Sequence, residues 1–151
     1  MSKKDDEKKI GEIFIAEYNC QNRTYFRIDE HYLQNREENK FPDLKFTNGR
    51  EMLAEVVRAV NQEILKQMNN YNDLDLIPCD PENELFLAIE NKQKKNYSIA
   101  REIILLIHIT FYAEKNDVTA MVPAIQECGF IFKEIWAVWE DDEKAKPLRL
   151  Q

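Results

Sequence analysis

The fold class follows from residues 118–142, which read VTAMVPAIQECGFIFKEIWAVWEDD. A segment of helical character ends at Cys128-Gly129, and glycine is the residue that most often closes a helix. The apolar run from Phe130 to Trp139 is rich in aromatic and β-branched residues, which is typical of a strand. A helix that passes directly into a strand predicts a core built from both kinds of element.

The segments before this junction are expected to be mainly helical. Residues 98–116 are apolar around most of a helical circumference, which predicts a long central helix that begins at Ser98. A further helix is expected over Thr119–Cys128, because Pro123 would then lie in its first turn. A strand over Val118–Val122 is the alternative, and the sequence leaves both open.

The first half of the chain is expected to supply a hairpin, a helix and a strand. Residues 12–18 and 23–28 predict two antiparallel strands, since apolar and polar side chains alternate in the second of them. A short helix is expected near His31–Arg36. Apolar residues spaced by three and four predict a helix from Asn48 to about Asn70, and the compact run Leu85–Ile89 predicts a buried strand.

Together these elements predict one α+β domain, in which a sheet of about four strands packs with two to three helices. The domain is expected to span residues 10–142, between flexible tails at 1–9 and 143–151. A chain of 151 residues buries about 70% of its unfolded surface, so its core is self-sufficient. The three cysteines, Cys20, Cys79 and Cys128, match no metal-binding spacing and predict a reducing, cytoplasmic setting.

Charge narrows the class of partner. The net charge of −7 disfavours a broad contact with phosphate backbones and favours a basic protein partner or simple solubility. No apolar stretch reaches the roughly twenty residues that a membrane span needs. With three glycines, the chain also lacks a glycine-rich nucleotide loop.

His108 with Cys128 is a conceivable nucleophilic pair, but we expect His108 to be a core histidine.

The leading functional hypothesis is a protein-binding module without catalysis or cofactor of its own. The end of the last predicted strand combines an aromatic anchor with carboxylates that would steer a basic partner. An inhibitor or immunity-type protein that blocks a nucleic-acid-handling partner has this size and sign. The residues of this predicted patch are Glu134, Trp139, Glu140, Asp141, Asp142 and Glu143.

The alternative hypothesis is a nuclease. Glu90-Asn91-Lys92, at the end of a predicted strand, resembles the motif of the Asp…(Asp/Glu)-x-Lys nuclease superfamily. The resemblance implies a Mg²⁺ ion that positions an attacking water. It also implies an upstream aspartate, for which Asp75 or Asp80 is the match, and a helical acid, for which Glu55 is the match.

Two plainer possibilities complete the sequence-based expectations. Arg23, Tyr25 and Arg27 form a small basic and aromatic strand face of the kind that nucleic-acid platforms use, although an ordinary wet strand face is expected here. A structural subunit that associates with a second copy of itself, through a sheet edge or an apolar helix, is the second alternative function.

Overall fold

A computed structural model describes residues 3–36, 42–59, 81–95, 100–109, 115–140 and 146–151. These residues form one α+β domain around a six-stranded mixed sheet, so the predicted fold class is confirmed, with more strands and helices than expected. The elements are α1 (Lys3–Asn22), β1 (Arg27–Ile28), α2 (Glu30–Asn35), β2 (Leu44–Thr47), β3 (Glu51–Ala59), α4 (Pro81–Lys94), η1 (Ala100–Glu102), β4 (Ile103–Ile109), α5 (Lys115–Ala120), α6 (Val122–Cys128), β5 (Glu134–Trp139) and β6 (Leu148–Arg149). None of the helices within these ranges is both long and apolar enough to cross a membrane.

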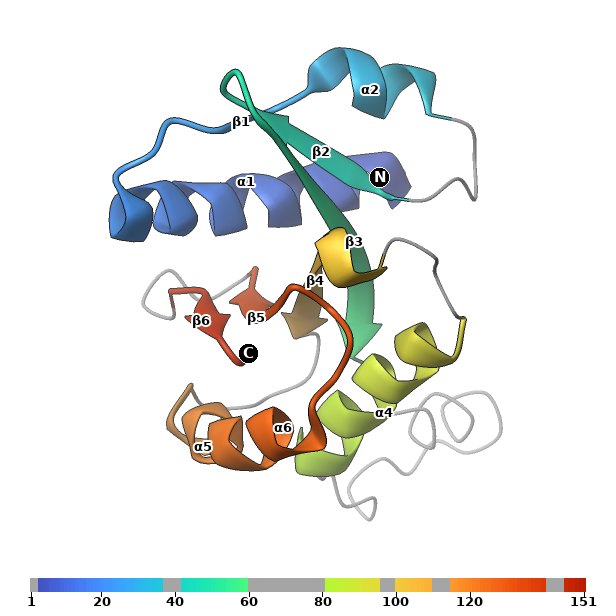
Figure 1. The fold of residues 1–151 in the computed structure, drawn as a ribbon, viewed down its shortest axis with the longest axis vertical. Helices are drawn as coiled ribbons and strands as arrows, with labels where there is room; N and C mark the ends of the chain where they lie inside the picture. Colours follow the sequence, from blue (N-terminus) through green and yellow to red (C-terminus); the bar gives the residue numbers. More distant parts are fainter. Residues whose placement is uncertain (1–2, 37–41, 60–80, 96–99, 110–114, 141–145) are drawn as a thin grey trace, which may run out of the picture.

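The strands lie in the sheet in the order of the sequence, from β1 to β6 (Figure 1). The strands β1, β2 and β3 pair antiparallel, β3, β4 and β5 pair parallel, and β6 returns antiparallel to β5. Parallel neighbours need a crossover, and α5 with α6 provides it between β4 and β5. The helix α4 lies in the chain between β3 and β4.

Helices cover both faces of the sheet (Figure 1). On one face α1 packs on an aromatic core, in which the rings of Phe14 and Trp136 lie 5.2 Å apart edge to face. Gly11 permits this close approach, because a Cβ there would lie 2.7 Å from Leu44 Cδ1. On the other face α4, α5 and α6 pack on a mainly aliphatic core.

The predicted N-terminal hairpin is wrong. Residues 12–18 belong to α1, which begins at Lys3 inside the expected N-terminal tail, and only Arg27–Ile28 of the second predicted strand form a strand. The helical signal was the spacing of Ile10, Phe14 and Tyr18, which places all three on the side of α1 that faces the sheet. At the other end, β6 lies within the expected C-terminal tail.

Three further elements have the opposite type from the one predicted. Within residues 48–70 the described part is the strand β3, and within 98–116 it is mainly the strand β4. Both strands are apolar on two faces because helices cover both, and such runs mimic a helical pattern. Conversely, Leu85–Ile89 lies in the helix α4, which continues to Lys94.

The predictions around residues 30–36 and 118–139 hold better. The short helix near His31–Arg36 is α2. The single helix predicted over Thr119–Cys128 is the end of α5 followed by α6, which begins just before Pro123, and the alternative strand over Val118–Val122 is wrong. Gly129 closes α6 in the left-handed conformation, with φ of 60°. The last predicted strand is β5, shorter than expected at Glu134–Trp139.

Candidate functional site

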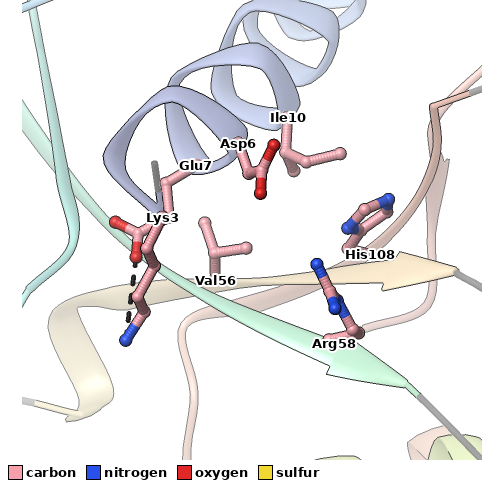
Figure 2. A pocket seen from close by; sticks show the side chains of 7 residues that line it. All are labelled: Lys3, Asp6, Glu7, Ile10, Val56, Arg58 and His108. Carbon is pink, nitrogen blue, oxygen red and sulfur yellow. Dashed lines mark ion pairs between the residues drawn. The ribbon is translucent and has the colours of Figure 1, made fainter. Parts of the chain in front are cut away.

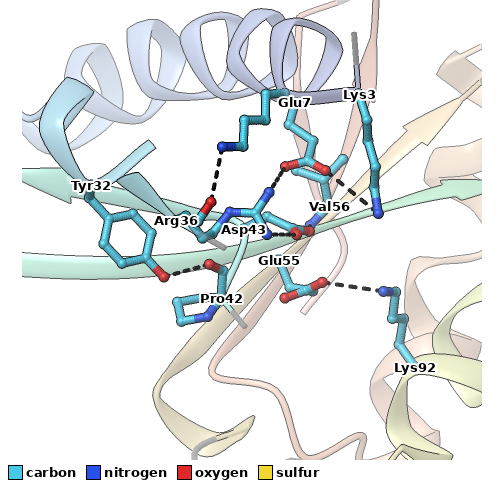
Figure 3. Close-up of polar contacts among 10 residues, drawn as sticks. Lys3, Glu7, Tyr32, Arg36, Pro42, Asp43, Glu55, Val56 and Lys92 are labelled. Carbon is cyan, nitrogen blue, oxygen red and sulfur yellow. Dashed lines mark hydrogen bonds and ion pairs between the residues drawn. The ribbon is translucent and has the colours of Figure 1, made fainter. Parts of the chain in front are cut away.

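Several buried charged side chains gather where β2 begins, beside the middle of β3 (Figure 3). We call Glu7, Asp43 and Glu55 the acid cluster. Glu7 comes from the first turns of α1, Asp43 directly precedes β2, and Glu55 lies in β3. The pairing of Leu44 with Ala54 sets Asp43 opposite Glu55 at the next position of the ladder. The antiparallel hairpin between β2 and β3 therefore brings the two acids together.

Asp43 is fixed by backbone and by charge. The Val56 N–H donates a hydrogen bond to Asp43 Oδ2 over 2.9 Å. Asp43 Oδ1 lies 3.6 Å from a terminal nitrogen of Arg36, whose side chain is as buried as that of Asp43. A buried carboxylate with a fixed backbone donor is a rigid oxygen ligand rather than a mobile surface group.

Glu55 faces a like charge. Burial, followed by the hydrogen-bonding contact with Asp43, raises the pKa of Glu55 to about 8. Lys92 of α4 opposes this rise, because its Nζ lies 3.3 Å from Glu55 Oε1. Near neutral pH the Glu55 carboxyl group therefore keeps a proton that a divalent cation could replace.

Glu7 is the third acid and reaches the others through Arg36. An Arg36 guanidinium nitrogen donates to Glu7 Oε2 over 3.0 Å, and the exposed Lys3 ammonium lies 3.9 Å from Oε1. Burial, and then the charge of Asp43, raise the pKa of Glu7 to about 7 in spite of Arg36. The guanidinium between Glu7 and Asp43 keeps these two acids apart at a fixed separation.

The cluster contains more acid than its buried cations neutralise. Three buried carboxylates face two largely buried cations, Arg36 and Lys92. Glu55 Oε2 and Glu7 Oε1 are buried and accept no hydrogen bond. Oxygen atoms of this kind are the ligands that Mg²⁺ and Mn²⁺ prefer, and Mg²⁺ commonly takes one or two carboxylates together with water and phosphate oxygens.

The described residues hold no group of three or more Asp, Glu, His or Cys side chains already arranged around a metal position. A cation at this site would therefore be held by the pair Asp43 and Glu55. Its remaining ligands would be water or a substrate oxygen, which is the usual arrangement for Mg²⁺.

Two hydrogen bonds fasten the backbone on either side of the acid cluster (Figure 3). The Tyr32 hydroxyl donates to the Pro42 carbonyl over 2.6 Å, next to Asp43. Lys4 Nζ donates to the Arg36 carbonyl over 2.9 Å. Both α1 and α2 therefore help to set the positions of Arg36 and Asp43.

The motif proposed from the sequence is split by the structure. Lys92 does reach the site, whereas Glu90 is exposed on α4 and takes no part in the acid cluster. Glu55, predicted as the helical acid, lies in the strand β3 opposite Asp43. Asp75 and Asp80 lie outside the described residues.

Sequence analysis missed Glu7, Arg36 and Asp43. The turn dipeptide Asn48-Gly49, midway between Asp43 and Glu55, was the signal that could have paired the two acids.

The predicted partner-binding patch is placed differently from what its hypothesis needs. Trp139 was expected as an exposed anchor, but its side chain is buried, with 7% of its surface exposed. Glu134 is also buried and accepts a hydrogen bond from Trp136 Nε1 over 3.0 Å. Glu140 binds Lys9 Nζ at 2.7 Å, and Asp141, Asp142 and Glu143 lie outside the described residues. Binding to a basic protein stays a prediction.

The two histidines and the exposed cysteines form no catalytic pair in the described part of the chain. His108 is buried, and its Nε2 lies 3.0 Å from Glu140 Oε2. Cys128 is exposed at the end of α6. His108 is therefore a partnered core histidine, as expected. Tyr25, between Arg23 and Arg27, is 89% exposed.

Searches with this chain returned no match to a protein-family model, to a curated protein or to a solved structure.

Proposed function

We propose that this protein is a divalent-metal-dependent phosphodiesterase that cleaves nucleic acid, in the manner of the Asp…(Asp/Glu)-x-Lys nucleases. The observation that carries the proposal is the buried pair Asp43–Glu55, with Lys92 Nζ 3.3 Å from Glu55. Two adjacent carboxylates and an ammonium group are the set of side chains that such chemistry uses. Asp43, Glu55 and Lys92 would thus supply the two acids and the lysine of that motif, although not at its spacing in the sequence.

The assignment of roles follows from position. Asp43 takes the place that the resemblance gave to Asp75 or Asp80, and Glu55 takes the place of Glu90. Lys92 keeps the role of the lysine but reaches the site from α4, because the residue two positions after Glu55 is Val57. Glu7 on α1 takes the role of the helical acid.

The residues of the site would divide the work as follows. A divalent cation held by Asp43 and Glu55 would supply Lewis-acid stabilisation of a phosphate oxygen and a more acidic water. Lys92 holds positive charge beside Glu55, where it would bind the attacking water or a non-bridging phosphate oxygen. Arg36 holds Glu7 and Asp43 in fixed positions and so acts as a positioning residue.

The acidity of the chain restricts how substrate would bind. With a net charge of −7, we expect few phosphate contacts beyond the site itself. The slope of affinity against salt concentration follows the number of phosphates that are neutralised. The proposed enzyme should therefore bind nucleic acid weakly and with a shallow salt dependence.

The direct test compares two conservative variants in a cleavage assay with single- and double-stranded DNA and RNA. We expect Mg²⁺- or Mn²⁺-dependent cleavage by the wild-type protein, and a loss of about 10²–10³-fold in Asp43→Asn. Glu90→Gln is the matched control, because Glu90 is exposed on the helix that carries Lys92. Equal loss in both variants, or metal-dependent cleavage unchanged in Asp43→Asn, would overturn the proposal.

A further inference from the structure

A cavity of about 450 Å³ lies beneath the N-terminal half of α1, on the opposite face of the sheet from Glu55 and Lys92 (Figure 2). Val56 lines it, and side chains of successive strand residues point to opposite faces, so Glu55 points away. Its volume is within the range of pockets that hold small ligands. The residues that shape it are Lys3, Asp6, Glu7, Ile10, Val56, Arg58 and His108.

Two residues of the cavity lie near the carboxyl ends of neighbouring parallel strands. Arg58 and His108 are register partners near the carboxyl ends of the parallel strands β3 and β4. Figure 2 shows the two side chains next to each other, with the Asp6 carboxylate directed from α1 toward the same space.

Arg58 differs from the other arginine near α1. Arg36 is buried and bound to Glu7, whereas Arg58 is exposed and forms no hydrogen bond or ion pair with another described residue. A guanidinium group presents a planar fork of donors that matches a phosphate group. Its ligand in the cavity is therefore expected to be an oxyanion.

The surroundings of Arg58 favour an anion that also carries polar groups. His108 is held by Glu140, which directs the imidazole at a fixed angle beside Arg58. Ile10 and Val56 supply an apolar wall that excludes water and strengthens contacts between charges. The Asp6 carboxylate can accept hydrogen bonds from hydroxyl groups of the same ligand.

We propose that this cavity binds a small phosphorylated ligand of the nucleoside-monophosphate class, with Arg58 on its phosphate and Asp6 on its hydroxyl groups. The site goes beyond the proposed cleavage site, with which it shares the side chain of Glu7, and binding of a phosphate at Arg58 does not require cleavage. The phosphate would rest against Arg58 and His108 at the ends of β3 and β4, and the remainder of the ligand would occupy the space under α1.

The test is calorimetric titration of the full chain with adenosine 5′-monophosphate, in EDTA so that no cation at the acid cluster can bind phosphate. Adenosine without phosphate is the ligand control. Arg101→Gln is the protein control. Arg101 is exposed at the opposite end of β4, and its substitution removes the same charge as Arg58→Gln. We expect Arg58→Gln to weaken binding at least tenfold and Arg101→Gln to leave it within twofold.

Three results would overturn the phosphate pocket: no binding of the nucleotide, equal binding of adenosine, or equal loss in the two arginine variants. Each is independent of whether the acid cluster cleaves nucleic acid, which the Asp43→Asn assay decides. Unchanged melting temperatures of both arginine variants would show that an affinity change reflects the site and not the fold.

Discussion

Two glutamates of this protein meet opposite environments. Glu55 is buried in β3 against Asp43, and its pKa is raised to about 8. Glu140 follows β5 near the surface between Lys9 and His108, and the hydrogen bond from Lys9 is the main cause that lowers its pKa. Glu55 has a like charge and one ammonium group beside it, whereas Glu140 has two basic groups within hydrogen-bonding distance.

The comparison separates groups that favour folding from groups that oppose it. A carboxylate with a lowered pKa stabilises the folded state when it is ionised. The ion pairs of Glu140 therefore contribute to folding. A carboxylate with a raised pKa loses free energy when it ionises, so Glu55 makes the fold less stable at neutral pH. Groups with strongly shifted pKa values cluster at functional sites, which is why we place the proposed function at Glu55.

The largest effect is expected from Glu55→Gln. The amide removes a cation ligand, so metal-dependent cleavage should fall by about 10³-fold, equal to about 4 kcal/mol of transition-state free energy. The same change removes a buried like charge and lets the amide donate to Asp43. Urea unfolding at pH 8 without metal should therefore show a stability equal to or above that of the wild type.

If Glu55 serves function, Glu55→Gln should lower the cleavage activity and leave the stability unchanged or higher. If Glu55 were purely structural, its substitution would lower the stability of the protein, and the wild-type protein would show no cleavage. Added Mg²⁺ gives a second readout, because it should raise the melting temperature of the wild type and not that of Glu55→Gln. A shift of equal size in both proteins would contradict cation binding by this carboxylate.

The second effect is expected from Lys92→Met, which keeps the length of the side chain and removes its charge. Three buried carboxylates would then face Arg36 alone among the largely buried cations of the described residues. Loss of one partner of a buried pair costs about 3 kcal/mol, and the measurement is urea unfolding at pH 8. The defect should shrink at pH 5, where Glu55 is protonated. A defect of the same size at both pH values would mean that packing, and not charge, is the cause.

The sequence allowed the class of the fold to be predicted but not the position of the site. The junction at Gly129 correctly predicted a helix followed by a strand. The site depends on the pairing of β2 with β3, and this was missed because Leu53, Val56 and Val57 fit a helical spacing as well as a two-sided strand. A sheet covered on both faces removes the alternation that identifies a strand.

Long-range contacts explain why the other residues of the site could not be predicted from the sequence. Glu7 and Arg36 are separated by 29 residues and meet only after α1 has packed on the sheet. Lys92 and Glu55 are 37 residues apart and meet only because the last turn of α4 lies beside β3. The pair Glu90 and Lys92 was attractive because it is local in sequence, but a helix directs residues two apart to different sides.

A third and smaller effect concerns pH. Glu55 and Glu7 have folded pKa values of about 8 and about 7, above the ordinary value of 4.5. The folded protein therefore binds more protons than the unfolded chain between about pH 4.5 and 8. The stability due to these groups is fully present below pH 4.5 and is lost as pH rises through the two folded values.

We expect the free energy of unfolding to fall by about 1–2 kcal/mol between pH 7 and pH 9 in EDTA. A divalent cation can replace the proton, so Mg²⁺ should remove most of this fall. Glu55→Gln should flatten the profile in EDTA. A wild-type profile that is flat, or that rises with pH, would contradict ionisation within the acid cluster.

The smallest effect is expected from Glu140→Gln. Its side chain is one-fifth exposed, and solvent screening limits ion pairs of this kind to about 0.5–1 kcal/mol. Because the pKa of Glu140 is lowered, its contribution is present above pH 4.5 and is lost as pH falls through the folded value. Wild type and Glu140→Gln should therefore differ in urea midpoint at pH 7 and converge near pH 3, a pH dependence opposite to that of Glu55→Gln. A difference that grows as the solution is acidified would mean that Glu140 also resists ionisation, and the contrast between the two glutamates would disappear.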